Sequence, residues 1–189
     1  MRLFVAVNLP DAVRNAVYAD AEPLRAASGR IKWVMPGSLH ITLKFLGRQD
    51  DRLVGDFERG LAGVAALHSA LDVRTRDIGA FPNFRRPRVV WVGMTGAERL
   101  SALAADIDTL FAGFGVPVER RPFRAHLTLG RVKDEMTSAE ARALELAASR
   151  PGSPRGFTIR TIDLMQSELG PGGSRYSVLA AVPLHARGT

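Results

Sequence analysis

The sequence predicts an α+β fold built on antiparallel β-sheets. Segments with strand and helix patterns alternate along the 189 residues, but several predicted strand pairs are separated only by turns. Antiparallel neighbours can be joined by a turn, whereas parallel neighbours need a long crossover, so a purely parallel, doubly wound sheet is disfavoured. No long linker divides the chain. We therefore expect one two-lobed domain over residues 1–189, in which the lobes share a core and can exchange strands.

The first half of the chain predicts strands and helices in alternation. Its first apolar run ends at Pro10, and proline suits the first turn of a helix. Val13, Val17 and Leu24 then recur at helical spacing. The predicted strands are residues 2–8, 31–34, 39–46, 71–78 and 89–94, the predicted helices are residues 12–27 and 53–67, and a loop with proline and arginine covers residues 81–88.

The second half repeats this order. Thr137 is followed three residues later by Glu140, which predicts a capped helix start at Thr137 or Ser138. The glycines between Gly170 and Ser174 predict a flexible loop between two closing strands. The predicted helices are residues 97–114 and 137–149, and the predicted strands are residues 116–119, 125–132, 157–169 and 176–182.

The composition excludes several classes of protein and site. Hydrophobic residues make up 46% and charged residues 24% of the chain, which excludes wholesale disorder. Cysteine is absent, so disulfides, cysteine-based metal sites and thiol nucleophiles are impossible. The N-terminal apolar run is too short for a signal peptide, and no apolar stretch reaches the ~20 residues that a membrane helix needs. We expect a cytoplasmic protein that has no contact with membranes.

The charge of the chain favours a polyanionic partner. Its formal net charge is +7, and only three of its 26 basic residues are lysines. The guanidinium of arginine matches phosphate oxygens with a planar fork of donors. Two other readings stay open: the preference for arginine can reflect genome composition, and the clusters can be plain solvated charge. The clusters are Arg85, Arg86 and Arg88, and Arg120, Arg121 and Arg124.

The strongest signal is a tetrapeptide that occurs once in each half. It reads His40-Ile41-Thr42-Leu43 in the first half and His126-Leu127-Thr128-Leu129 in the second. With nine threonines in the chain, two such pairs among four histidines arise by chance in roughly one chain in a hundred. Residues two apart on a strand share a face, so each histidine stands beside its threonine and the aliphatic residues face the core.

Two such pairs converging on one cleft suit phosphoryl chemistry. An imidazole with a pKa near ~6.5 exists in both protonation states near neutrality, so one histidine can accept a proton from water and the other can donate one to a leaving oxygen. Hydroxyls of Thr42 and Thr128 can donate to phosphate oxygens. Arg131 lies five residues after His126, and a bend at Gly130 would aim its charge at the same place.

Each of these residues also has a structural interpretation. A single His-x-Thr pair on a strand is most often a hydrogen-bonded, partly buried pair, and it is the duplication that favours catalysis. A metal site is disfavoured because neither motif contains a carboxylate. His68 and His185 are expected on the surface or at helix ends. The aromatic residues expected in the core are Trp33, Trp91 and Phe45, although Phe45 reaches the site if the strand bends or ends.

The paired motifs resemble the two-histidine phosphoesterase superfamily, and within it the RNA 2′,3′-cyclic phosphodiesterases, long called 2′-5′ RNA ligases. The resemblance covers nearly the whole chain. It implies a bilobal α+β fold whose two related antiparallel sheets line a central cleft, with helices packed outside. The residues that carry it are 2–7, Trp33-Val34-Met35-Pro36, 40–47, 87–93, Phe123-Arg124, 126–131, Ser167, Leu169 and Tyr176.

The resemblance also implies an activity and roles for residues. The activity is opening of a ribose 2′,3′-cyclic phosphate to a 2′-phosphate without a metal or other cofactor. By the resemblance, His40 protonates the departing 3′ oxygen and His126 activates water. Thr42 and Thr128 would bind phosphate, Arg131 would help hold the phosphate and Phe45 the nucleotide. The chain departs from the family at Ala125, where proline is frequent, and at Gly130, where alanine is common, and both changes bear on how the second motif is aimed.

Several alternatives to this function stay open. The same chemistry would serve a cyclic nucleotide, a 2′-5′ oligonucleotide or 2′-5′ RNA ligation, because hydrolysis and ligation share a transition-state geometry. A non-catalytic RNA-binding module would explain the basic charge but not the two matched imidazoles. We expect RNA ends with a 2′,3′-cyclic phosphate as the substrate, and a monomer, since two lobes of one chain complete the site.

Overall fold

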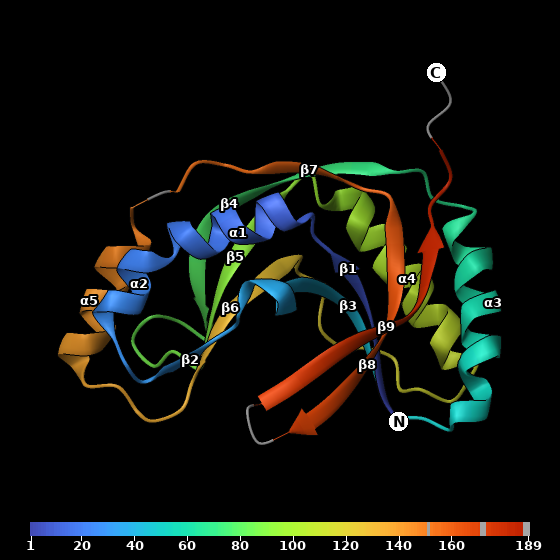
Figure 1. Cartoon of the computed structure of the whole chain (residues 1–189), viewed down its shortest axis with the longest axis horizontal. Helices are drawn as coiled ribbons and strands as arrows, with labels where there is room; N and C mark the ends of the chain where they lie inside the picture. The colour runs from blue at the N-terminus through green and yellow to red at the C-terminus, as the bar shows by residue number, and fades with distance from the viewer. Residues whose placement is uncertain (151, 171–172, 187–189) are drawn as a thin grey trace.

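A computed structural model describes residues 1–150, 152–170 and 173–186 of the chain. The structure combines nine strands, all paired antiparallel among the described residues, with helices inserted between them (Figure 1). The strands are β1 (Arg2–Asn8), β2 (Ile31–Trp33), β3 (His40–Arg48), β4 (Leu71–Phe81), β5 (Val89–Thr95), β6 (His126–Val132), β7 (Gly156–Ile159), β8 (Thr161–Gly170) and β9 (Gly173–Pro183). The helices are α1 (Asp11–Asp20), α2 (Glu22–Ala27), α3 (Val54–Ala65), α4 (Glu98–Ala112) and α5 (Ser138–Ala148), with short 3₁₀ turns η1 (Pro36–Ser38) and η2 (Asp51–Leu53).

The strands form one curled antiparallel sheet with two halves. Its order is β7-β4-β5-β6-β3-β1-β8-β9, and β2 pairs with β6. The halves meet where β3 pairs with β6 through the single register pair Ile41–Leu127. The predicted α+β fold with antiparallel strands is therefore confirmed, and the two expected sheets are the halves of one curled sheet joined at the motif strands.

Each half of the sheet has its own helices, and the chain crosses between them. We call the half with β3, β1, β8 and β9 the β3 lobe, and the half with β2, β4, β5, β6 and β7 the β6 lobe. Helices α3 and α4 pack on the β3 lobe, although α4 follows β5 of the other lobe. Helices α2 and α5 pack together, and α5 contacts β4 of the β6 lobe (Figure 1).

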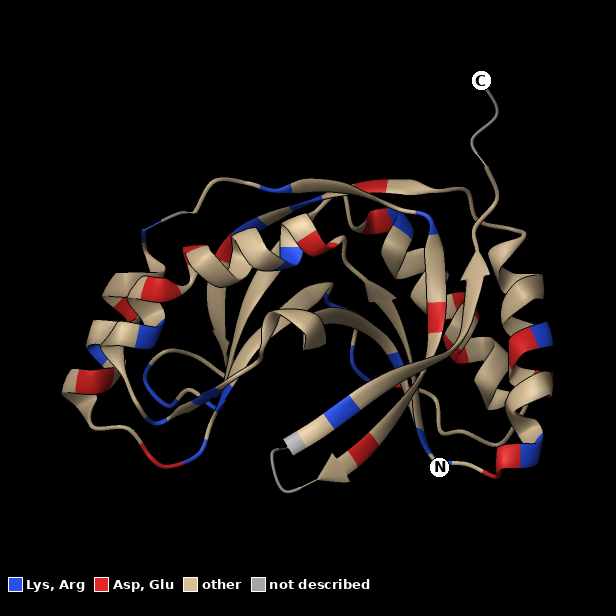
Figure 2. Cartoon of the chain, in the orientation of Figure 1, with Lys and Arg blue, Asp and Glu red and all other residues tan. Residues whose placement is uncertain are grey.

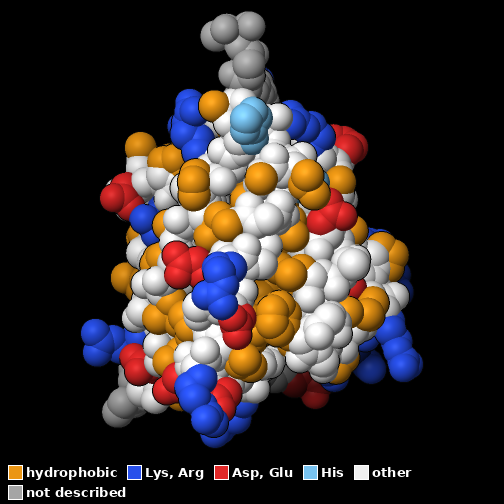
Figure 3. Space-filling model, turned by 90° about the vertical axis from the view of Figure 1, so that its right-hand side faces the viewer, with side chains coloured by type: hydrophobic (Ala, Val, Ile, Leu, Met, Phe, Trp, Pro, Cys, Tyr) orange, Lys and Arg blue, Asp and Glu red, His pale blue; other side chains and the backbone are white. Residues whose placement is uncertain are grey.

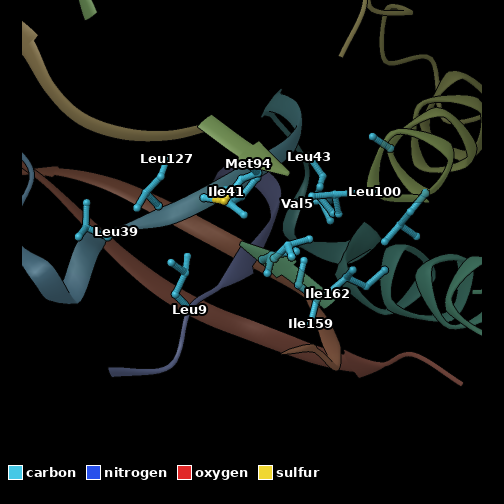
Figure 4. Close-up of a cluster of buried hydrophobic side chains, with 14 of the residues drawn as sticks. Val5, Leu9, Leu39, Ile41, Leu43, Met94, Leu100, Leu127, Ile159 and Ile162 are labelled. Carbon is cyan, nitrogen blue, oxygen red and sulfur yellow. The ribbon is translucent and has the colours of Figure 1, made fainter. Parts of the chain in front are cut away.

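The hydrophobic core anchors the two motif strands. Ile41 and Leu127 are fully buried and lie in one cluster with aliphatic residues from both lobes (Figure 4). Between α3 and α4, the rings of Phe57 and Phe111 meet edge to face at 5.1 Å. The face of the molecule on the α3 side carries basic, acidic and hydrophobic side chains interspersed (Figure 3). Within the described ranges, none of the helices combines the length and the hydropathy of a membrane span.

Two predicted elements are interrupted in the structure. The predicted helix over residues 12–27 divides at Ala21 into α1 and α2, because Pro23 has no N–H for the continuing ladder. The predicted strand over residues 157–169 breaks at Arg160, where β7 ends and β8 begins. These two strands have different partners: β7 pairs with β4, and β8 pairs with β1 and β9.

Two further predictions can be compared directly. The predicted strand over residues 116–119 is wrong: Pro117 cannot donate to a ladder, and its carbonyl accepts from Lys44 Nζ at 2.6 Å. The capped start of α5 is confirmed, because Thr137 and Glu140 exchange hydrogen bonds as a capping box. The loop predicted at residues 170–174 is shorter than predicted, because Gly170 ends β8 and Gly173 begins β9; residues 171 and 172 lie outside the described residues.

Candidate active site

The two motifs present their polar pairs on the concave side of the sheet, one pair in each lobe. His40 and Thr42 are half-buried on β3, while Ile41 between them is fully buried. His126 and Thr128 occupy the same positions on β6. Because β3 and β6 pair directly, the two motifs lie at the junction of the lobes.

A β-bulge follows the threonine in each motif. On β3, Thr42 pairs with Ala6 and Lys44 with Val5, so Leu43 is the extra residue. On β6, Thr128 pairs with Trp91 and Gly130 with Val90, so Leu129 is the extra residue.

After each bulge, the alternation of side chains between the two faces of the sheet is shifted by one residue. The fifth residue after each histidine therefore returns to the histidine's face, and these residues are Phe45 and Arg131. The sequence predicts that Arg131 reaches the site through a bend at Gly130, and the bulge places this bend one residue earlier, at Leu129.

Each imidazole is held by a backbone carbonyl two residues before it. His40 Nδ1 lies 2.8 Å from the carbonyl oxygen of Ser38, and His126 Nδ1 lies 2.7 Å from that of Arg124. A carbonyl only accepts, so Nδ1 is the donor in both pairs. The remaining ring nitrogen, Nε2, is then free to exchange a proton, and both histidines are held in the same orientation.

Aromatic side chains support His40. Its ring centroid lies 5.0 Å from those of Phe4 and of Tyr176, which meets it edge to face. Phe4 also lies 6.2 Å from Phe45, which is 65% exposed rather than in the core. The rings of Phe45, Phe4 and Tyr176 thus form an aromatic cluster beside the imidazole, in which Phe4 is buried and Phe45 is exposed.

Aromatic side chains support His126 in the same way. The ring of Phe81 meets it edge to face at 5.3 Å, and Trp91 lies 6.4 Å away. Phe81 and Trp91 stack on each other at 4.9 Å. Trp33 packs against the core as expected, whereas Trp91 forms part of the wall of the site. Sequence reasoning did not identify Phe4 or Phe81, whose positions depend on strand pairing.

The surroundings of His40 change its proton affinity. Burial is the main cause that lowers the pKa of His40 below the ordinary value for histidine. The hydrogen bond to Ser38 opposes this shift, and the positive charges of Arg131 and His126 add to it. The charges of Arg131 and His126 on β6 therefore act on the imidazole of His40 on β3, as expected if both motifs form one site.

The other two histidines and the two arginine clusters that the sequence singled out lie on the surface of the molecule. His68 follows α3 and pairs with Asp106 at 2.7 Å, and His185 is exposed on the C-terminal segment. Basic residues follow the 82–88 loop and the adjoining ends of β2 and β6 along one rim (Figure 2). In the described part of the chain, no three His, Asp or Glu side chains are grouped to hold a metal ion. All six arginines of the two clusters are exposed: Arg85, Arg86, Arg88, Arg120, Arg121 and Arg124.

Comparisons with known proteins identify the family. The model of the 2′-5′ RNA ligase superfamily matches residues 9–171. The chain belongs to this superfamily. An RNA 2′,3′-cyclic phosphodiesterase of Methanothermobacter thermautotrophicus is 33% identical over 179 residues, which are 94% of this chain and 95% of the relative.

Solved structures of similar proteins agree with this assignment. The crystal structure of TT0787 from Thermus thermophilus has a TM-score of 0.81 and 29% identity over 100% of both chains. E. coli LigT complexed with 3′-AMP has a TM-score of 0.74 and 26% identity over 97% of each chain. The bilobal architecture is therefore that of the superfamily, and phosphodiesterase is the enzyme class of its curated relatives.

The close packing of β2 against β6 explains why a glycine occupies position 130. A Cβ at this position would lie 2.5 Å from Ile31 Cγ2 and 3.0 Å from Trp33 Cε3. Both neighbours belong to β2, which pairs with β6 across this glycine. A glycine therefore lets β2 lie against the bulge that aims Arg131.

We expect Gly79→Ala to displace the wall behind His126. A Cβ at Gly79 would lie 2.2 Å from Trp91 Cζ2, so the indole must move. Overpacking of this kind costs about 1–3 kcal/mol of unfolding free energy, measured by urea titration. We also expect kcat to fall, because Trp91 contacts His126.

Gly63→Ala is the matched control. A Cβ at Gly63 meets nothing within 4 Å, and this residue lies inside α3. Alanine is favoured over glycine in a helix, so this variant should be unchanged or slightly more stable. Equal effects of the two substitutions would contradict the proposed contact with Trp91.

Proposed function

We propose that this chain hydrolyses the 2′,3′-cyclic phosphate at RNA ends to a 2′-phosphate by acid–base catalysis with two histidines. His126 Nε2 accepts a proton from a water molecule as its oxygen bonds to phosphorus. The bond between phosphorus and the 3′ oxygen breaks, and His40 Nε2 donates a proton to that oxygen. The proton balance leaves His126 charged and His40 neutral, and exchange with solvent restores both.

The observation that carries this proposal is the duplicated anchoring of the imidazoles. Two histidines from two lobes have the same hydrogen bond from Nδ1 to a backbone carbonyl, the same neighbouring threonine and the same bulge. A binding module has no need for two matched proton carriers. The names of the curated relatives support the same chemistry.

Other residues on the same face have proposed roles in binding. Hydroxyls of Thr42 and Thr128 donate to the non-bridging phosphate oxygens, whose charge must be held in the transition state. Arg131 adds a charge-assisted contact to the same phosphate. Phe45 offers an exposed ring to the nucleotide. One chain supplies both histidines, which supports a single two-lobed domain that acts on RNA ends as a monomer; a cytoplasmic location is part of the proposal.

The assay that tests this function is opening of RNA 2′,3′-cyclic phosphate ends in the presence of EDTA. We expect turnover, with a 2′-phosphate as the product. Joining of 2′-5′ linked RNA halves without hydrolysis would favour the ligase alternative. Binding of the RNA end without any turnover would favour the RNA-binding module. Turnover that EDTA abolishes would contradict the metal-free step.

We expect substrate binding to shift the pH dependence of the reaction. The pKa of His40 is lowered in the free protein, so its acidic form is lost as the pH rises through a value below about 6.5. A bound phosphate anion favours the imidazolium, so in the complex this loss occurs at higher pH.

The profile of kcat/KM reports the free enzyme, and that of kcat reports the complex. The alkaline limb of kcat/KM should therefore lie at lower pH than that of kcat. Arg131→Ala should move the alkaline limb of kcat/KM to higher pH, because it removes one of the charges that lower the pKa of His40. Coincident limbs, or the reverse order, would contradict His40 as the acid.

A further inference from the structure

A pocket of about 340 Å³ lies on the concave face directly beside His40. Its volume falls in the range of small-molecule sites, roughly 300–1,000 Å³. It lies between η1, the N-terminal part of α1 and strands β8 and β9, away from His126. It shares His40 with the proposed reaction, but Thr42, Thr128, Arg131 and His126 do not line it.

One wall of this pocket is a buried carboxylate. Asp163 on β8 is only 4% exposed, and its Oδ2 accepts from Asn8 Nδ2 at 2.7 Å. Among the described residues, Asp163 forms no ion pair with a lysine or arginine. A carboxylate has about four acceptor sites, so capacity remains toward the pocket. An unpaired buried charge is costly, which favours a ligand that donates to it.

The arginine of this pocket is paired with an acidic side chain, although its buried Nε–H has no hydrogen-bond partner among the described residues. Arg14 lines it, but its guanidinium pairs with Asp11 and donates to the carbonyl of Gly37 at 3.2 Å. With Asp163 opposite, a second phosphate would be repelled. The pocket therefore suits an uncharged group that carries N–H or O–H donors.

Part of the pocket lining is apolar. Phe4, Ala6, Met165 and Tyr176 form a small cluster on the concave face, separate from the main core. Met165 and Tyr176 line the pocket itself, with Val178 at its rim. Apolar and aromatic side chains next to a hydrogen-bonding carboxylate suit a heterocycle, which needs both apolar contact and a polar group that fixes its orientation.

We propose that this pocket is a nucleobase subsite, and that Asp163 selects bases that present adjacent N–H donors. Guanine presents N1–H and N2–H together, whereas the one N–H of uracil lies between two carbonyl oxygens that a carboxylate repels. The proposal rests on the proposed function only in placing the base of an RNA end beside His40.

The test compares guanine and uracil substrates on one enzyme sample. We expect kcat/KM for guanosine 2′,3′-cyclic phosphate to exceed that for the uridine compound by at least about tenfold. A dinucleotide pair that differs only in the base before the terminal one shows which nucleotide fills the pocket. A guanine preference in either pair supports the subsite, and the absence of a guanine preference in both pairs overturns it.

Asp163→Asn should reduce that preference to about one, because an amide both donates and accepts. The ratio of two substrates on the same sample does not depend on how much of the variant folds. Glu168→Gln is the matched control: it removes the same charge from an exposed position on β8 outside the pocket and should keep the preference. Ala181→Leu, which fills the pocket from its rim, should lose it.

A binding measurement separates this subsite from the proposed function. Calorimetry with guanosine and uridine 2′-monophosphates needs no turnover, and the guanosine compound should bind at least about tenfold more tightly. Such a preference without cyclic-phosphate opening would overturn the function and keep the subsite. Turnover with equal binding of the two nucleotides and equal kcat/KM values would overturn the subsite alone. A preference that persists in Asp163→Asn would remove Asp163 from the proposal.

Discussion

Replacing His40 or His126 with alanine is expected to reduce kcat for cyclic-phosphate opening by about 10²–10⁴-fold. This is the usual contribution of one general acid or base. Each imidazole is fixed through Nδ1 and has only Nε2 left for proton transfer, so no neighbouring side chain replaces it. The measurement is single-turnover kinetics with a saturating RNA end, which separates chemistry from binding.

The double variant His40→Ala/His126→Ala should lose less than the product of the two single losses, because the two groups act as a unit. His68→Ala is the matched control, since His68 pairs with Asp106 outside the site. It should keep nearly full turnover. A single variant at His40 or His126 that keeps nearly full turnover would remove that residue from the mechanism.

Local periodicity was sufficient to predict the faces of the motif strands. The rule that residues two apart share a face placed His40 beside Thr42 and Ile41 in the core, because one side of this sheet is buried. It did not place Phe45 or Arg131. Both reach the site through a bulge, and a bulge depends on how two strands pair, which a single strand's sequence does not specify.

The parts of the site that come from distant segments were outside the reach of sequence patterns. Tyr176 and Asp163 reach the pocket beside His40 only because β8 pairs with β1 and β9 with β8. No local signal distinguishes such residues from ordinary strand residues. The break between α1 and α2 was different, since Pro23 stands in the sequence where the ladder fails.

Lys44 shows what the first bulge contributes to stability. Without the bulge, this side chain would face the cleft with His40. Instead it is 6% exposed, forms an ion pair with Asp108 on α4 and donates to the carbonyl of Pro117. Asp108 also accepts from the backbone N–H of Glu119. The first motif strand thereby holds the segment that leads into the second motif.

We expect Lys44→Met to lower the free energy of unfolding by about 3–5 kcal/mol, the usual cost of removing one partner from a buried ion pair. The measurement is urea unfolding. Adding Asp108→Asn should restore part of this loss, because the uncompensated carboxylate disappears while an acceptor for Glu119 remains. The exposed pair of Arg59 and Asp56 is the control, and Arg59→Met should cost less than about 1 kcal/mol.

Strictly additive effects of Lys44→Met and Asp108→Asn would contradict this coupling, because independent sites add and contacting sites do not. The coupling also bears on catalysis. Asp108 and Pro117 precede His126 on the same chain, so losing the Lys44 contacts frees the approach to β6. Lys44→Met should therefore lower kcat more than KM rises, since it changes how the second imidazole is aimed and not what contacts the phosphate. A rise in KM at unchanged kcat would place Lys44 in substrate binding instead.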